Sequence, residues 1–500
     1  MIHKYLKYYT IVSIVLILTA CEQFLSELPT KGTDQPISTL EQLEGLIDGL
    51  GGSTTSWRET NTTMAFSTDD NYIPIELYAV YKTGALAVSN LYFYTFNVED
   101  IANQASDALW SNQFALIYRA NLILENVDKV SGEPAQKARI RAEAYFLRAY
   151  CYWLLANYYC LPYAPGNMQE QGLPKKLTTS PEEDYRHMTL AKTYELIDAD
   201  LEEALKIDMI EHKYNWRANK ASINAFLSRY YMFKGEYDKA IAAADFALVN
   251  RGVAKLKDYN LLVAGTPLIY VNPADTIHRC ETDLYSTAQM IHWEETFYVR
   301  FAYNGTWMMP SPELLALYDQ KNDMRYKWFM HPKMYRRFIS TTVPVFGYSM
   351  FGNGIYAWSG PTIQEVMLNK AESLLRKSTP DIAGALSVVN ELRNHRIAPS
   401  APDIHLTAST RDEALIKVLQ ERRRELPFGH RWWDIRRFST TETIVDKVTV
   451  THVFYPVNNG VVDMTKTQSY TLPLGSRRYA IPINGIDIDT SQGKIEQNTY

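Results

Sequence analysis

The chain has 500 residues, of which 46% are hydrophobic, and its formal net charge at pH 7 is −5. That length allows about two to four domains, and the apolar content is enough for a sizeable core. The small net charge and the lack of a long basic run argue against a nucleic-acid partner. Aromatic content stands out, with 35 Tyr and 10 Trp residues, and tyrosine suits both helix packing and polar ligand surfaces.

Residues 1–20 have the pattern of a lipoprotein signal peptide. Two lysines precede an apolar run over 10–20 that is too short to cross a bilayer of ~30 Å as a helix. The small residues before Cys21 resemble the lipobox of bacterial lipoproteins, in which the cysteine is acylated, for example with palmitate. We therefore expect a membrane anchor at Cys21 and a flexible tether over 21–36. An ordinary secretory peptide with an accidental cysteine is the alternative.

Helical periodicity is the main secondary-structure signal. It predicts helices over 39–50, 110–130, 135–159 and 189–207 and a helix pair over 220–250. The pair is similar to a tetratricopeptide unit, because Gly235 falls at the turn and small residues fall where the two helices touch. Weaker echoes occur in the hairpin over 110–159 and at 365–397.

The predicted fold is mainly α, with tetratricopeptide-like helix pairs that form a right-handed superhelical scaffold. Loop-rich insertions and a few short strands complete it. The scaffold is expected over about 37–52, 104–250 and 361–438, the insertions over about 53–103 and 254–360, and a C-terminal segment over 439–500. In that segment, residues 448–455 are the clearest strand candidate.

The two insertions carry many of the aromatic residues. Flat rings on rigid loops can pack against the C–H face of a sugar, while nearby polar side chains bind its hydroxyl groups. The residues that we expect to contact ligand are Asp70, Tyr72 and Tyr78 in the first insertion and Tyr303, Asn304, Trp307, Tyr356 and Trp358 in the second. Alternatively, these rings build a local core beneath the insertions.

Residues 421–438, which we call the clasp, mix arginines with tryptophans. Glu421 and Glu425 share one helix face, and Pro427 and Gly429 end that helix before a second one begins. The composition predicts buried ion pairs within an aromatic wall, where the planar fork of arginine can both pair and stack. We expect the clasp to fix the last helices against the repeats. The arginines favour ionised carboxylates and argue against catalysis by either glutamate.

Motifs for catalysis, metal or cofactor binding are missing from the sequence. It has no phosphate loop, zinc-protease helix or nucleophile elbow, so we expect no cofactor and no metal. Two adjacent acid pairs lie in the insertions, Asp69 with Asp70 and Glu294 with Glu295, so a glycoside hydrolase remains open. Cys151, Cys160 and Cys280 are expected to be buried free thiols.

Four features resemble the SusD/RagB family of outer-membrane nutrient-binding lipoproteins. They are the lipobox before Cys21, the pattern Trp110…Tyr118…Asn121, the helix pair that ends in 389–396, and the clasp. The clasp is the most specific, since it is similar to the family signature at Glu421, Arg422, Glu425, Leu426, Gly429, Arg431, Asp434, Arg436 and Arg437. Two departures are Pro427-Phe428, where the commoner signature has an acid, and Thr499-Tyr500, where a terminal Pro-Gly-Tyr is usual.

The resemblance implies a single SusD-like domain over 37–500, without catalytic activity, on the cell-surface face of the outer membrane. Such a protein caps a SusC-like TonB-dependent transporter and hands it a ligand, usually an oligosaccharide. Capture of a peptide or glycoprotein by the same architecture is the alternative. A lipid-anchored glycoside hydrolase, and a scaffold that binds the transporter but no ligand, are less favoured.

Overall fold

The computed structural model describes residues 37–52, 58–59, 62–80, 82, 86–210, 214–252, 254–267, 279–303, 308–332, 345–351, 356–441 and 443–500. The expected signal peptide and tether lie outside these residues. No helix in the described part of the chain is long and apolar enough to cross a membrane.

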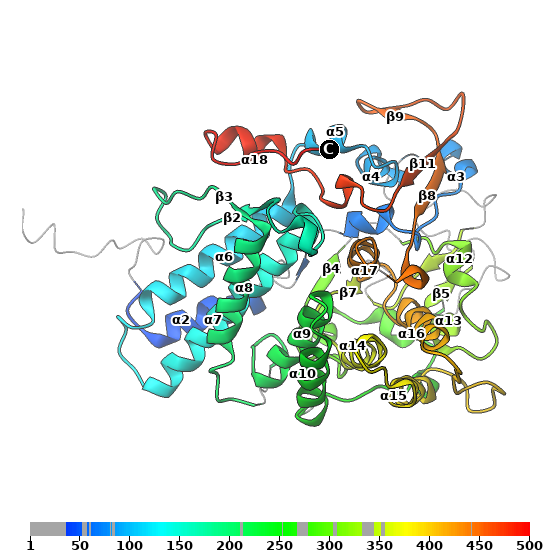
Figure 1. Cartoon of the computed structure of the whole chain (residues 1–500), viewed down its shortest axis with the longest axis horizontal. Helices are drawn as coiled ribbons and strands as arrows, with labels where there is room; N and C mark the ends of the chain where they lie inside the picture. Colours follow the sequence, from blue (N-terminus) through cyan, green and yellow to red (C-terminus); the bar gives the residue numbers. More distant parts are fainter. Residues whose placement is uncertain are drawn as a thin grey trace, which may run out of the picture.

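The scaffold consists of helices that follow one another across the molecule (Figure 1). They are α2 (Leu40–Gly52), α6 (Ala108–Asn126), α7 (Pro134–Tyr159), α8 (Leu190–Ala204), α9 (Lys220–Phe233), α10 (Tyr237–Val249), α14 (Ile363–Arg376), α15 (Ile382–Asn394), α16 (Arg411–Glu425) and α17 (Arg431–Phe438). The mainly α fold with tetratricopeptide-like helix pairs is therefore confirmed.

Helices α6 and α7 form the predicted antiparallel hairpin. The Asp107 carboxylate begins α6 by accepting hydrogen bonds from the backbone N–H groups of Leu109 (3.0 Å) and Trp110 (3.3 Å). Pro134 begins α7, at the position where its missing N–H costs nothing. Every residue of α7 from Phe146 to Tyr159 is buried, which makes α7 the central helix of this half.

Helices α9 and α10 form the tetratricopeptide-like pair that the sequence predicts. A reciprocal capping box between Asn219 and Ser222 begins α9. Gly235 adopts a φ of 77° at the turn, a conformation that glycine tolerates without strain. Alanines such as Ala225 and Ala244 are buried where α9, α10 and α14 meet, so small side chains let the helices approach closely.

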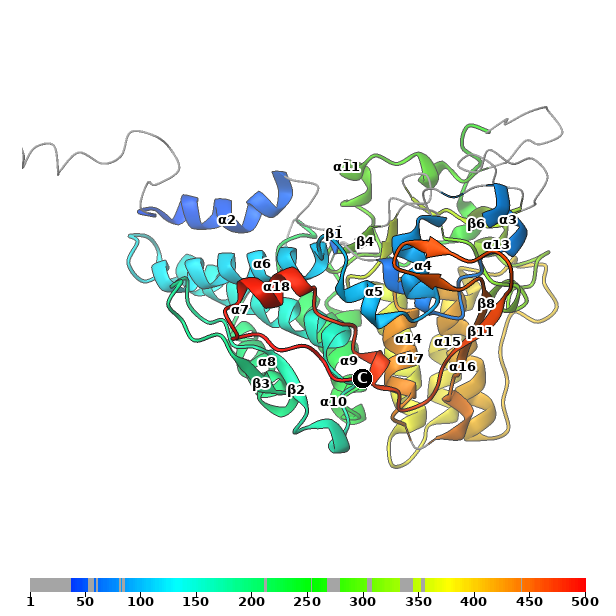
Figure 2. The same cartoon turned by 90° about the horizontal axis from the view of Figure 1, so that it is seen from above.

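The insertions contain several short helices. In the first insertion these are α3 (Ile75–Val80), α4 (Val88–Tyr94) and α5 (Val98–Ala102), and in the second α11 (Thr287–Met290), α12 (Pro312–Leu315) and α13 (Met324–Phe329). Most are too short to show a clear helical period in the sequence. Helices of this length are stabilised by tertiary packing more than by intrinsic propensity. Viewed from above, α3, α11 and β6 (Gly347–Tyr348) lie along one edge of the molecule, opposite α14 to α16 (Figure 2).

A three-stranded sheet joins the two insertions. Strand β4 (Phe301–Tyr303) pairs in parallel with β1 (Arg58–Glu59) and antiparallel with β7 (Tyr356–Trp358). Strand β5 (Met330–His331) pairs with β6 in a separate two-stranded ribbon. The first insertion therefore depends on the second for part of its backbone pairing.

The C-terminal segment folds back over the scaffold. The predicted strand over 448–455 is confirmed as β8 (Val450–Phe454), which pairs with β11 (Gln468–Leu472). The smaller strands of the fold are β9 (Val457–Asn458) with β10 (Val461–Val462), and β2 (Gln171–Pro174) with β3 (His187–Thr189). The Ile481 N–H then donates to the Tyr158 carbonyl, near the C-terminal end of α7, at 2.8 Å. The helix that follows, α18 (Gly485–Thr490), lies close to the N-terminal part of α6.

The three described cysteines, Cys151, Cys160 and Cys280, are buried free thiols, as predicted.

Candidate ligand sites and the clasp that positions them

The clasp binds the first insertion through two aspartates. Arg431 makes a two-pronged contact with Asp69, Nε to Oδ1 at 2.7 Å and Nη2 to Oδ2 at 2.8 Å. Arg423 Nε donates to Asp70 Oδ1 at 2.6 Å, and the Phe428 N–H donates to Asp70 Oδ2 at 3.0 Å. Both aspartates are therefore committed to positioning the insertion on α16 and α17.

The clasp also binds the second insertion, through its glutamates. Arg325 of that insertion forms ion pairs with Glu421 (2.8 Å) and Glu425 (2.7 Å). Arg396, just after α15, bridges Glu425 (2.9 Å) to Glu295 of the insertion (2.7 Å). These side chains are almost fully buried, so each charge needs its partner.

The remaining clasp residues hold the scaffold helices. Arg422 Nε donates to Asp434 and its Nη1 to Asn369 of α14, both at 2.8 Å. Arg437 pairs with Glu372 of α14. Arg436 contacts no carboxylate in the described part of the chain, and its guanidinium donates instead to backbone carbonyls, including that of Tyr479 at 2.8 Å. Burial lowers the pKa of Arg436 to about 10, and the hydrogen bonds satisfy a charge that would otherwise be costly.

Two of the acidic groups that could suggest catalysis, Glu421 in the clasp and Asp69 in the first insertion, are held ionised. Burial alone would raise the pKa of Glu421, but nearby arginines, led by Arg325, outweigh it and hold that pKa well below its usual range. Burial likewise opposes ionisation of Asp69, yet Arg431 and Arg423 lower its pKa to about 2. A general acid needs a proton near neutral pH, so neither group fits that role.

Four of the eight predicted ligand residues are buried side chains, which corrects the expectation that they lie on an open surface. Asp70 is bound within the clasp. Tyr78 packs edge-on against Phe454, with ring centroids 5.5 Å apart. Tyr356 and Trp358 belong to β7, and Trp358 packs against Phe301 at 4.4 Å. These aromatic residues build a local core under the insertions, as the alternative interpretation holds.

The other four predicted ligand residues differ from one another. Tyr72 is 43% exposed, and its backbone N–H is fixed by the Met309 carbonyl at 2.9 Å. Tyr303 ends β4, and its side chain is not among those described. Asn304 and Trp307 lie outside the described residues. Among the predicted contacts whose side chains the structure describes, Tyr72 is the one that lies on the surface.

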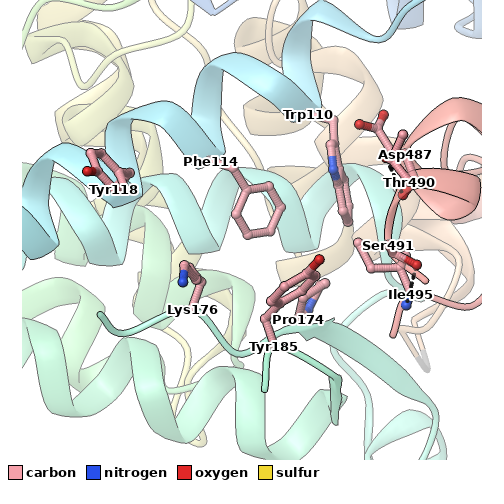
Figure 3. Close-up of a pocket in the computed structure, with 10 residues that line it drawn as sticks. All are labelled: Trp110, Phe114, Tyr118, Pro174, Lys176, Tyr185, Asp487, Thr490, Ser491 and Ile495. Carbon is pink, nitrogen blue, oxygen red and sulfur yellow. Dashed lines mark hydrogen bonds between the residues drawn. The ribbon is translucent and has the colours of Figure 1, made fainter. Parts of the chain in front are cut away.

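A cleft along α6 is a second candidate site, and the sequence did not reveal it. Its cavity volume is about 320 Å³, within the ~300–1,000 Å³ typical of ligand pockets. One wall is α6, the facing wall is the chain between β2 and β3, and α18 with the residues after it closes one end (Figure 3). The lining residues are Trp110, Phe114, Tyr118, Pro174, Lys176, Tyr185, Asp487, Thr490, Ser491 and Ile495.

Aromatic side chains dominate the α6 wall of this cleft. Trp110 and Phe114 lie one turn apart with ring centroids at 4.8 Å, and Tyr159 of α7 supports Trp110 from behind at 4.9 Å. Tyr118, one turn further along, is 47% exposed. On the facing wall, Lys176 lies 5.9 Å from the Tyr185 ring centre, and Lys494, which follows α18, lies 4.6 Å from it, so both lysines make cation–π contacts with that ring.

Asp487 provides an acceptor at the closed end of the cleft. Its carboxylate accepts no hydrogen bond from any described residue. Burial, and then the nearby carboxylate of Asp107, raise the pKa of Asp487. Asp107 itself is occupied, because it caps α6 and accepts a hydrogen bond from the Tyr159 hydroxyl. A group that donates a hydrogen bond to Asp487 would therefore stabilise this end of the cleft.

The sequence signal for the cleft is incomplete. Trp110, Phe114 and Tyr118 recur every four residues, which the helical pattern attributes to packing within the hairpin. That α18 meets this stripe depends on a contact between segments more than 350 positions apart. No group of three or more His, Cys, Asp or Glu side chains that could hold a metal ion occurs among the described residues.

Comparison with known proteins identifies the family. A family model described as "Starch-binding associating with outer membrane" matches residues 23–232, and the model of the SusD family matches residues 293–500. The SusD-like protein P38 of Formosa agariphila is 24% identical over 395 residues, which cover 66% of this chain and 71% of that protein.

Solved structures share the fold. A SusD superfamily protein from Bacteroides thetaiotaomicron superposes with a TM-score of 0.66 at 19% identity, over 92% of this chain and 100% of the other. A putative sugar binding protein from Bacteroides vulgatus gives a TM-score of 0.63 at 19% identity, over 93% of this chain and 99% of the other. With the two family models covering most of its length, the chain belongs to the SusD/RagB family.

Proposed function

We propose that this protein captures an oligosaccharide at the cell surface and delivers it to a SusC-like TonB-dependent transporter in the outer membrane. The observation that carries the proposal is the family match on both halves of the chain, one of whose models is described as starch-binding and associated with the outer membrane. The lipobox before Cys21 supports the location, because acylation there would anchor the chain without a membrane-spanning helix.

The arrangement of charge supports binding without catalysis. The acids that are adjacent in sequence within the insertions have structural partners: Asp69 and Asp70 bind clasp arginines, and Glu295 binds Arg396. The exposed Tyr72 and the rings along α6 remain available to a ligand. We therefore propose a binding protein that holds its ligand through rings and hydroxyl-binding side chains.

Titration calorimetry of the soluble chain from residue 22, against a panel of neutral and acidic polysaccharides and of peptides, tests the capture step. We expect heat of binding with at least one glycan and none with the peptides. Binding to peptides alone would replace glycan capture with peptide capture. Release of reducing ends by the purified protein, abolished by one Asp or Glu substitution, would replace it with hydrolysis.

Delivery needs its own test. We expect the lipid-anchored chain to co-purify from outer membranes with one TonB-dependent transporter, and we expect deletion of the chain to slow uptake of the bound glycan. Co-purification without any glycan binding would instead indicate a scaffold.

A further inference from the structure

We propose that the cleft along α6 is a saccharide-binding site for a neutral oligosaccharide, distinct from any site on the loop-rich side. The inference rests on the proposed function, glycan capture, and adds a place and a ligand class to it. The cleft belongs to the helical scaffold, whereas Tyr72 and the other predicted ligand residues belong to the insertions.

The spacing of the rings fits an extended ligand. Trp110, Phe114 and Tyr118 lie at successive turns of α6, so the stripe extends for about 12 Å at a rise of ~1.5 Å per residue. That length exceeds a single sugar ring. Tyr185 faces the stripe across the cleft, so a chain of sugars would have aromatic surface on two sides (Figure 3).

Exposure separates these rings from ordinary core aromatics. Tyr118 is 47% exposed and stacks on no other ring in the part of the chain that the structure describes. Phe114 is partly exposed, while Trp110 is buried by its support from Tyr159 but still lines the cleft. The outer rings thus present surface that a bound molecule would cover, and the innermost ring is supported by Tyr159.

The charges of the lining favour a neutral ligand. Lys176 is already paired with Glu183 at 3.0 Å, and the cleft also contains the Asp487 carboxylate, which would repel an anionic ligand. A cationic ligand would meet Lys176 and Lys494 around Tyr185. A hydroxyl group satisfies the site better, since it can donate to the Asp487 carboxylate, which accepts no hydrogen bond from a described residue, without bringing a charge. Sugars combine such hydroxyl groups with an apolar ring face.

The test measures binding of the tightest glycan from the calorimetric panel to Tyr118→Ala, Phe114→Ala and Asp487→Asn. Tyr231→Ala is the matched control, because Tyr231 is also a partly exposed helical tyrosine but lies on α9, outside the cleft. We expect each cleft variant to bind about 5- to 10-fold more weakly, as loss of one ring contact or hydrogen bond predicts. The control should bind as the wild type does.

The outcomes separate the two proposals. If the wild type binds a glycan and all three cleft variants bind it within about twofold of the wild type, the cleft proposal is overturned and glycan capture stands. If the wild type binds no glycan, both fall. Cleft variants that keep glycan binding but lose co-purification with the transporter would show that the cleft is a protein interface. Tyr118→Ala removes a half-exposed ring, so a folded variant is available even if Phe114→Ala is unstable.

Discussion

Replacing Arg431 with alanine tests whether the clasp holds the first insertion in place. The substitution removes both hydrogen bonds from the guanidinium to Asp69, at 2.7 and 2.8 Å. The side chains of Arg431 and Asp69 are 8% and 23% exposed, so the pair is mostly shielded from water. Breaking a buried ion pair from one side typically costs about 3–5 kcal/mol, because the remaining charge stays desolvated.

The expected cost lies at the low end of that range. Asp69 keeps one arginine, since Arg423 Nη1 lies 3.2 Å from its Oδ2, and the carboxylate still reaches solvent. We therefore expect Arg431→Ala to lower the free energy of unfolding by about 3 kcal/mol. Urea unfolding at neutral pH measures it. The control is Arg186→Ala, whose ion pair with Asp184 is largely exposed and should contribute less than about 1 kcal/mol.

Two results would refute this reasoning. A loss of stability no larger than that of the control would mean that the Arg431–Asp69 pair does not hold the insertion. Normal stability with abolished glycan binding would place Arg431 in the ligand site and not in the clasp. Folded Arg431→Ala protein should instead bind the glycan with unchanged affinity.

Acid should weaken the clasp through Asp69, whose pKa is lowered to about 2 from an ordinary 3.8. A carboxyl group whose pKa is lowered on folding stabilises the fold above about pH 4, and this stabilisation is lost as the pH falls toward 2. In urea unfolding at several pH values, the difference in free energy of unfolding between wild type and Asp69→Asn should therefore shrink over that window. A constant difference would contradict the assignment. Gly429→Ala should destabilise the chain by about 2 kcal/mol or more in the same assay, because its Cβ would lie 2.3 Å from the Trp358 carbonyl oxygen. Gly45→Ala in α2 is its control, since nothing lies within 4 Å of the added Cβ, and a helical glycine replaced by alanine should gain about 0.5–1 kcal/mol.

The scaffold could be predicted because its signals are local. The small residues and Gly235 of α9 and α10 lie within one segment of about thirty residues, where helical period and turn chemistry agree. The mixture of arginines and tryptophans in the clasp likewise indicates buried ion pairs. Their partners could not be predicted, because Asp69 lies 362 positions before Arg431.

The ligand surface was harder to predict for the same physical reason. Tyr356 and Trp358 are residue types that are typical of exposed ligand-binding surfaces, but pairing of β7 with β4 buries them. The stripe on α6 has the period of helix packing, yet Tyr118 is exposed because no described element covers that end of the cleft. Periodicity indicates which residues share a face, and only the tertiary fold determines what covers it.

Native mass spectrometry of the soluble chain, mixed with a glycan of defined length, tests the central claim of capture without cleavage most directly. The mass increase gives both the presence of the ligand and its length. We expect a non-covalent complex that contains the intact oligosaccharide, with occupancy reduced in Tyr118→Ala. A chain that acquires no glycan, or one that holds only shortened products, would contradict the account.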